Sequence, residues 1–329
     1  MNIRKTPSSY LSRTYPCTFD TVLTGLCLSF LLIFSSCRTT QKTGQAQLQG
    51  FKYSYCTPTV AYMETGWQDT LTAISPASPL SPHDRLLCKV LGIGSDLNLL
   101  TGSKSSTGGT DSLTPYTRLF LQQRIGGRIQ DARTQLDAVA AELDCEGERS
   151  NLAAIYLDNL NSKTNKRLTI TSVVTGALTT VATALISGKH AQTVTGVSGG
   201  LLSAAFALMT INPRGRAIAF YHERNLLKNI WEDQAVNGEY PFFVWRMLHE
   251  QAFSNSGRIT LSQSIKNRWI QFEFDGKISK TQERLLFGSG GNYHSDDLHT
   301  RAAMLNQLQS TIRSIDQDLA NLVAFIQRT

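Results

Sequence analysis

Residues 295–328 read SDDLHTRAAMLNQLQSTIRSIDQDLANLVAFIQR, and their pattern is the clearest in the 329-residue chain. Aliphatic residues recur there at alternating steps of three and four, which places them on one side of an α-helix. They are Leu305, Leu308, Ile312, Ile315, Leu319, Leu322 and Ile326. Ser295, followed by two aspartates, is typical of a helix N-cap with an acidic first turn. The pattern therefore predicts a long terminal helix over 296–327.

A second stretch with the same spacing lies at 116–160. Its apolar seam consists of Ile125, Ile129, Ala132, Leu136, Val139 and Leu143. We expect the two long helices to pack against each other within one chain, with self-association through the seam as the alternative. Shorter helical segments are expected at 214–235, 241–252 and 259–273. The predicted fold is mostly α: an elongated helical bundle over 81–329, with two long heptad-patterned helices and a hydrophobic helical hairpin rich in small residues.

The hairpin is predicted at 168–213. Two runs, 168–188 and 191–213, contain no charged residue and are separated only by Lys189 and His190. Each is long enough to cross a bilayer, although their many Thr, Ser, Ala and Gly residues make the insertion free energy marginal. Small residues recur at every fourth position, which predicts a smooth stripe for close helix contact. This small-residue stripe comprises Ser172, Gly176, Thr180, Ala184, Gly188, Gly196, Gly200 and Ala204.

Three interpretations of the hairpin follow from its composition. The first places it at the centre of a soluble bundle, where the amphipathic helices screen its outer faces. In the second, residues 168–211 insert in a membrane, alone or as an oligomeric pore. In the third, the hairpin is a surface apolar patch that docks on another envelope protein.

The first residues of the chain have the three parts of an export signal. Arg4, Lys5 and Arg13 form a basic leader, an apolar core follows at 22–34, and Ser35 and Ser36 are small residues where a peptidase would cut. The apolar core is shorter than the roughly 18 to 20 residues that a membrane-spanning helix needs. It therefore favours a cleaved signal over a membrane anchor.

Residues 33–37, IFSSC, resemble the lipobox of bacterial lipoproteins, with Phe34 where that class prefers leucine. The resemblance implies that residues 1–36 are removed as a signal peptide and that lipid is attached to Cys37. A soluble periplasmic product is the alternative. Arg38 is not the aspartate that retains some lipoproteins at the inner membrane, so the resemblance implies the outer membrane, facing the periplasm. Residues 37–80 would then form a lipid-anchored tether and an irregular segment.

Three further cysteines remain in the mature chain: Cys56, Cys88 and Cys145. An oxidising compartment allows one disulfide among them and one leftover thiol. We expect a bridge between Cys88 and Cys145, because both lie in segments predicted to be helical, while Cys56 lies in the tether. The chain has no CxxC pair, which argues against zinc-knuckle or thioredoxin-type chemistry.

Motifs of catalysis are missing from the sequence. It contains no P-loop, no GxSxG and no HExxH. His294, Asp296 and His299 could ligate a metal, but a glycine-rich turn that leads into a capped helix explains the same residues, and we expect no metal and no cofactor. Four carboxylates, Glu142, Asp144, Glu146 and Glu148, resemble a solvated helix face more than a catalytic pair.

The composition also narrows the class of partner. Without residues 1–36 the formal charge falls from +7 to +5, and the basic residues are spread along the chain, which argues against nucleic acid. We expect a non-catalytic envelope lipoprotein that is held to a membrane through Cys37. It would scaffold or dock other envelope proteins, or self-associate, through its long helices. A membrane-active or pore-forming lipoprotein that inserts 168–211 is the alternative.

Overall fold

The computed structural model describes residues 49–58, 62, 80–102, 113–210, 215–236, 238–254 and 256–328. Two units are distinguished, Met1–Gln49 and Gly50–Thr329. The expected signal peptide, Cys37 and most of the tether at 37–80 lie outside the described residues. The mostly α fold is confirmed. The described part of Gly50–Thr329 consists of helices, one two-stranded sheet and the loops that connect these elements.

The longest element is helix α5, Pro115–Leu185, which runs for 71 residues without a break. Thr114 is its N-cap and accepts a hydrogen bond from the backbone N–H of Thr117 at 3.2 Å. Pro115 follows in the first turn, where its missing N–H costs nothing. The helix therefore includes both the predicted stretch 116–160 and the first arm of the hairpin.

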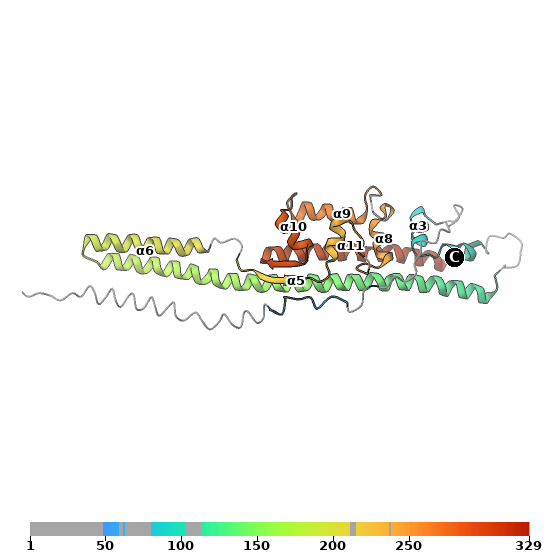
Figure 1. Cartoon of the computed structure of the whole chain (residues 1–329), viewed down its shortest axis with the longest axis horizontal. Helices are drawn as coiled ribbons and strands as arrows, with labels where there is room; N and C mark the ends of the chain where they lie inside the picture. Colours follow the sequence, from blue (N-terminus) through green and yellow to red (C-terminus); the bar gives the residue numbers. More distant parts are fainter. Residues whose placement is uncertain are drawn as a thin grey trace, which may run out of the picture. The chain divides into compact units, whose positions relative to one another are not determined.

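Helix α11, Ser295–Arg328, lies along α5 and confirms the predicted pairing of the two long helices (Figure 1). Both apolar seams are buried in this contact. On α11 the buried residues include Leu298, Leu305, Leu308, Ile312, Ile315, Leu319 and Leu322. On α5 they include Leu121, Ile125, Ile129, Ala132, Leu136, Val139 and Leu143.

Short elements surround this pair of helices. They are α3 (Pro82–Val90), α4 (Gly94–Gly102), α7 (Leu226–Glu232), α8 (Phe242–His249), η1 (Gln251–Phe253), α9 (Leu261–Arg268), the π-helix η2 (Trp269–Glu273) and α10 (Lys280–Phe287). Ser81 caps α3 and accepts a hydrogen bond from the backbone N–H of Asp84 at 3.0 Å. Trp269 is fully buried and belongs to the core.

The prediction of a helix over 214–235 is wrong for the first part of this range, which forms strand β1 (Ile218–Tyr221). This strand pairs with β2 (Gly290–Tyr293) in antiparallel register. Burial alternates along β1, as the period of two in a strand requires. Gly290 has a φ of +98°, and a Cβ there would overlap the carbonyl oxygen of Phe220. Only glycine therefore fits at this point of the pairing.

Helix α6, Lys189–Met209, folds back along the end of α5 and completes the hairpin. Residues 186–188 form the turn, and Lys189 and His190 begin α6 at the tip. Figure 1 shows α6 beside the last part of α5, beyond the part of α5 that α7–α11 accompany. No residue of α6 is buried.

Candidate functional site

The two arms of the hairpin touch through small residues. The hydroxyl of Ser172 donates to the backbone carbonyl of Ser203 at 2.9 Å, and the hydroxyl of Ser203 donates to the carbonyl of Ser172 at 3.0 Å. A Cβ added at Gly176 would lie 3.4 Å from the Ser203 hydroxyl. Nearer the tip, a Cβ added at Gly199 would overlap the side chain of Thr179. Such close approach is typical of helix pairs that associate in lipid.

The predicted small-residue stripe follows this contact only in part. Ser172, Gly176 and Gly196 face the partner arm, but the remaining members of the stripe are exposed. These are Thr180, Ala184, Gly188, Gly200 and Ala204. An α-helix has 3.6 residues per turn, so each step of four residues advances the stripe by about 40° and carries it out of the contact. The stripe prediction is therefore wrong at these positions, and Gly199 takes the place expected of Gly200.

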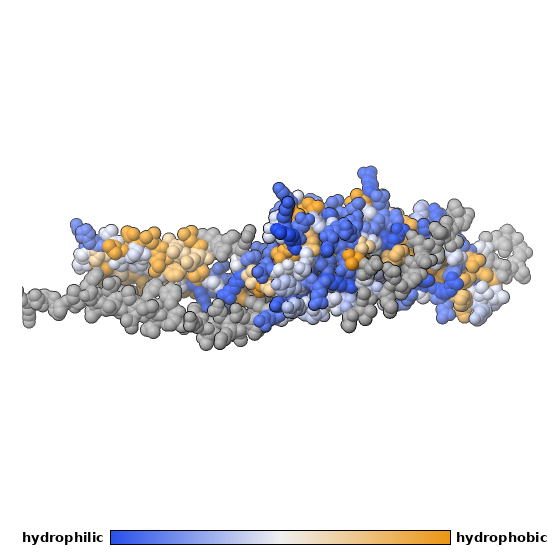
Figure 2. Space-filling model, viewed as in Figure 1, coloured by the Kyte–Doolittle hydropathy of each residue, from blue (hydrophilic) through white to orange (hydrophobic). Residues whose placement is uncertain are grey.

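Aliphatic side chains cover the outer surface of the hairpin. Leu185, for example, is 78% exposed. The exposed aliphatic residues are Ile170, Val173, Val174, Leu178, Val181, Leu185, Val194, Val197, Leu201, Leu202, Leu208 and Met209. Figure 2 shows a largely apolar surface along α6. The first interpretation, a hairpin at the centre of a soluble bundle, is therefore wrong, because the described amphipathic helices pack on the earlier part of α5 and leave the hairpin uncovered.

By length and composition, α5 and α6 are the two described helices that could cross a membrane. Helices in the core of a soluble protein can meet the same criteria, but those helices are mostly buried. Here the apolar window of α5 is 6% buried and that of α6 is 0% buried. The hairpin is thus as apolar as a helix from a protein core, yet its residues are exposed like those of a protein surface.

Most hydroxyl groups of the hairpin have hydrogen-bond partners inside the hairpin itself. Within each arm, side-chain hydroxyls donate to backbone carbonyls three or four residues earlier. These donors are Thr179, Thr180, Thr183, Thr193, Thr195, Ser198 and Thr210. A polar group in hydrocarbon must be satisfied internally, and this arrangement meets that condition for these hydroxyls. The Thr and Ser content is therefore less unfavourable for insertion than the composition alone indicates.

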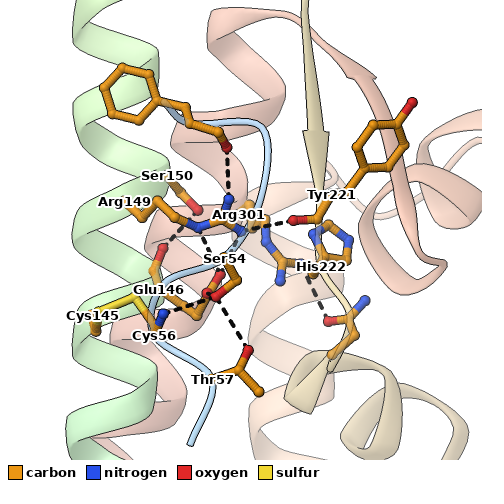
Figure 3. A network of polar contacts seen from close by, with 12 residues as sticks. Ser54, Cys56, Thr57, Cys145, Glu146, Arg149, Ser150, Tyr221, His222 and Arg301 are labelled. Carbon is orange, nitrogen blue, oxygen red and sulfur yellow. Dashed lines mark hydrogen bonds and ion pairs between the residues drawn. A yellow bond between two sulfur atoms is a disulfide. The ribbon is translucent and has the colours of Figure 1, made fainter. Parts of the chain in front are cut away.

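A second feature is a buried charge cluster on α5, formed by Glu142, Glu146 and Arg149 with Arg224 and Arg301. Figure 3 shows Glu146, Arg149 and Arg301 of this cluster. The predicted solvated face is wrong for Glu142 and Glu146, which are buried, while Asp144 and Glu148 are exposed. Glu142, Glu146 and Arg149 are spaced at steps of four and three, so they share the face of α5 that carries its apolar seam. This spacing is the signal in the sequence that could have revealed the cluster.

Arg149 joins three separate segments of the chain. Its Nη2 lies 2.9 Å from Glu146 Oε2, its Nη1 donates to the carbonyl of Phe51 at 2.8 Å, and Nη2 also donates to the carbonyl of Tyr221 at 3.1 Å. The guanidinium stacks on the ring of Phe220 at 3.8 Å. A fully buried arginine requires such complete pairing.

The disulfide joins Cys56 to Cys145, and the expected bridge between Cys88 and Cys145 is wrong. The Ser54 hydroxyl donates to Glu146, and the contacts of Arg149 hold the same segment, so Cys56 is brought to α5 with a Cα–Cα distance of 5.6 Å. Cys88 is a free thiol, fully buried in α3. Burial raises its pKa to about 12, which keeps it protonated and unreactive.

Glu142 forms the second half of the cluster. Its Oε1 lies 3.0 Å from Arg224 Nε, and its Oε2 accepts from the Tyr62 hydroxyl at 3.2 Å. Burial raises the pKa of Glu142 to about 7, against the opposing effect of the Arg224 charge. Raised carboxyl pKa values are found at catalytic sites and in structural ion-pair networks alike. Here Glu142 is enclosed by these two partners, which is typical of a structural role.

Arg301 of α11 completes the cluster. Its Nη1 donates to Asn225 Oδ1 at 3.3 Å and to the carbonyl of Leu286 at 3.1 Å. His222 lies nearby and is 3% exposed. Burial lowers the pKa of His222 to about 2, and the positive charges of Arg301 and Arg149 lower it further. His222 is therefore neutral in the folded protein across the physiological pH range.

The three residues considered for a metal site are not brought together as a set of ligands in the structure. His299 Nε2 lies 2.9 Å from Asp158 Oδ2 of α5, and the backbone N–H of His294 donates to Asp297 Oδ2 at 3.2 Å. Within the described ranges, no group of three or more His, Cys, Asp or Glu side chains is arranged to hold a metal ion. Asp296 is exposed at the first turn of α11.

Comparisons of the chain with protein-family models, with curated proteins and with solved structures find no match. Function must therefore be argued from the chain's own residues. Two features carry that argument: the exposed apolar hairpin, and the buried charge cluster that fixes residues 51–56 to α5.

Proposed function

We propose that this protein is a non-catalytic envelope lipoprotein held to a membrane at two points, by lipid on Cys37 and by insertion of hairpin 168–211. The helical bundle outside the membrane then acts as a scaffold on which other envelope components dock. The observation that carries the proposal is that twelve large aliphatic side chains of the hairpin are exposed. Soluble monomeric proteins rarely expose an apolar surface of this extent, and such surfaces mark sites that contact a membrane or another protein.

The dimensions of the hairpin support insertion. Helix α6 has 21 residues, and at 1.5 Å per residue it is about 31 Å long. The hydrocarbon core of a bilayer is about 30 Å thick. Lys163, Lys166 and Arg167 stand before the apolar run and Arg216 after it, at the base of the hairpin, while Lys189 begins α6 at the tip. Charges at both ends and none between them match the two polar surfaces of a bilayer.

The two anchors can occupy the same membrane. Phe51 is held at α5 by Arg149, and its ring lies 6.4 Å from that of Tyr156. From Tyr156 to the first apolar turn of the hairpin at Leu168 is about 18 Å along the helix axis. The chain between Cys37 and Phe51 can extend over about 46 Å. This length exceeds the distance of about 18 Å along the helix, so lipid on Cys37 and the hairpin can enter the same bilayer surface.

The test is fractionation of a chain with an ordinary cleavable signal and Cys37→Ser, which removes the lipid anchor. We expect this protein to remain in the membrane through an alkaline carbonate wash, because the hairpin holds it there. The hairpin variant is Val197→Glu with Leu201→Glu, at two exposed positions of α6. We expect it to be released, because a charge in the hydrocarbon core is costly.

The matched control is Tyr116→Glu with Leu119→Glu, at two exposed positions in the first turns of α5, far along the helix from the hairpin. It carries the same added charge and should stay in the membrane. A Cys37→Ser chain that appears in the soluble periplasm would refute insertion. If that soluble chain then bound one envelope protein through the hairpin, the docking interpretation would replace it.

A further inference from the structure

The base of the hairpin contains a groove that the anchoring role does not use. The groove has a volume of about 390 Å³ and lies between α5, the end of α6 and the start of α11. We define the base groove by its lining residues, Asp158, Asn161, Thr164, Asn165, Leu168, Met209, Gly215, Arg216, Ser295 and Asp296. Leu168 begins the uncharged part of α5, and Met209 ends α6. In the inserted protein the groove therefore lies at the level of the lipid headgroups.

The wall formed by residues 215–216 is fixed to α5. The backbone N–H of Arg216 donates to Asn161 Oδ1 at 3.0 Å. Gly215 has a φ of +59°, and a Cβ at this position would overlap the Asn161 side chain. The chain that returns from the hairpin is thus held close to α5 at a left-handed position that favours glycine. Arg216 is itself one of the residues that line the groove.

The groove carries charges of both signs. Arg216 is its cation, and its side chain forms no ion pair with another residue of the described ranges. Asp158 and Asp296 are its carboxylates, and Asp158 lies 2.9 Å from His299 Nε2. Asp296 has no such partner among the described residues. The groove therefore offers one available positive group and one available negative group beside the apolar side chains of Leu168 and Met209.

We propose that the base groove binds the headgroup of a phospholipid that carries both a phosphodiester and a primary ammonium, an ethanolamine-type lipid. Arg216 binds the phosphate, since a guanidinium presents paired N–H donors to phosphate oxygens. Asp296 binds the ammonium, and the acyl chains lie against the aliphatic side chains that follow Leu168. An anionic headgroup without an amine would leave Asp296 unpaired. This inference rests on the insertion proposed above.

The test uses the full lipidated protein in vesicles with equal amounts of phosphatidylethanolamine and phosphatidylglycerol. Vesicle flotation first shows that the protein is membrane-bound, and native mass spectrometry after gentle extraction then counts the lipids retained. We expect retained phosphatidylethanolamine in the parent protein. Arg216→Gln or Asp296→Asn should reduce it by about fivefold each, the effect of one lost charge contact at the membrane surface.

Two control variants remove the same charges outside the groove. Arg167→Gln lies at the same level of the hairpin, and Asp131→Asn lies on an exposed face of α5. Both should retain phosphatidylethanolamine like the parent. Equal retention in all variants, or a preference for phosphatidylglycerol, would overturn the proposal. The proposal would also be overturned if soluble glycerophosphoethanolamine bound as tightly as phosphatidylethanolamine, because this would show that the acyl chains are not required. A protein that does not float at all, even with its lipid anchor, would overturn insertion together with this inference.

Discussion

Ser172 on α5 and Ser203 on α6 exchange hydrogen bonds across the hairpin, each hydroxyl donating to the backbone carbonyl of the other. Both side chains are only partly buried, so the pair lies at the edge of the contact between the arms. In hydrocarbon neither hydroxyl could find water, and the reciprocal bonds satisfy both. The relationship explains how a hairpin rich in serine and threonine can remain compact while its outside is aliphatic.

The contact between the arms predicts different results for two neighbouring glycines. Gly199→Leu should disrupt the hairpin, because its side chain would overlap Thr179, and overpacking of this kind costs about 1–3 kcal/mol. Gly200→Leu should be tolerated, because nothing lies within 4 Å of a Cβ at that position. The measurement is the yield of the oxidised cross-link in a Ser172→Cys, Ser203→Cys background. Equal yields in both leucine variants would contradict the arrangement of the arms.

The disulfide gives a prediction on stability. Cys56 and Cys145 are 89 residues apart, and closing a loop of this length stabilises a fold by about 2–5 kcal/mol. Reductant should therefore lower the thermal unfolding temperature of the parent protein. It should have the same effect on Cys88→Ala, whose thiol is not in the bridge, and little effect on Cys56→Ser. A reductant effect that disappears in Cys88→Ala would instead support the bridge first expected.

His222 predicts a loss of stability in acid. Its pKa is about 2 in the folded protein and about 6.5 when unfolded, so below pH 6.5 the unfolded chain binds a proton that the folded chain does not. The contribution of His222 to the free energy of unfolding should then fall by about 1.6 kcal/mol between pH 6.5 and 5, since one pKa unit corresponds to about 1.36 kcal/mol. Urea unfolding at both pH values tests this.

The comparison variant for that experiment is His222→Gln, which cannot take up the proton. Glu142 has the opposite effect, because its pKa is raised and the folded state binds the extra proton between about pH 4.5 and 7. Glu142 is unchanged in the variant, so the difference between parent and variant isolates His222. A parent and variant with the same pH dependence would show that His222 is accessible to protons when folded.

The pairing of α5 with α11 could be predicted from sequence because periodicity reports which residues share a face. Leu136 on α5 and Ile312 on α11 are buried as their spacing requires. Periodicity does not report what covers an apolar face. Sequence alone therefore favours a buried hairpin between Leu168 and Met209, whereas the surrounding helices leave it exposed.

The charge cluster and the disulfide were not predictable for a different reason. Residues 51–58 have no regular secondary structure, so no pattern in the sequence indicates where they run. Their position depends on Arg149, which contacts the carbonyl of Phe51 from a distance of 98 residues along the chain. Cys56 consequently looked like part of a tether, although it is fixed to the middle of α5.

The most direct test of the central claim is a measurement of the depth of Leu201 in a bilayer. Leu201 is 68% exposed on α6, and Leu201→Cys can carry an environment-sensitive fluorophore in the Cys37→Ser chain reconstituted in vesicles. Insertion predicts a blue-shifted emission that is quenched by spin labels on the lipid acyl chains and is protected from aqueous iodide. Emission that iodide quenches as fully as it quenches the free fluorophore would place the hairpin in water and contradict the account.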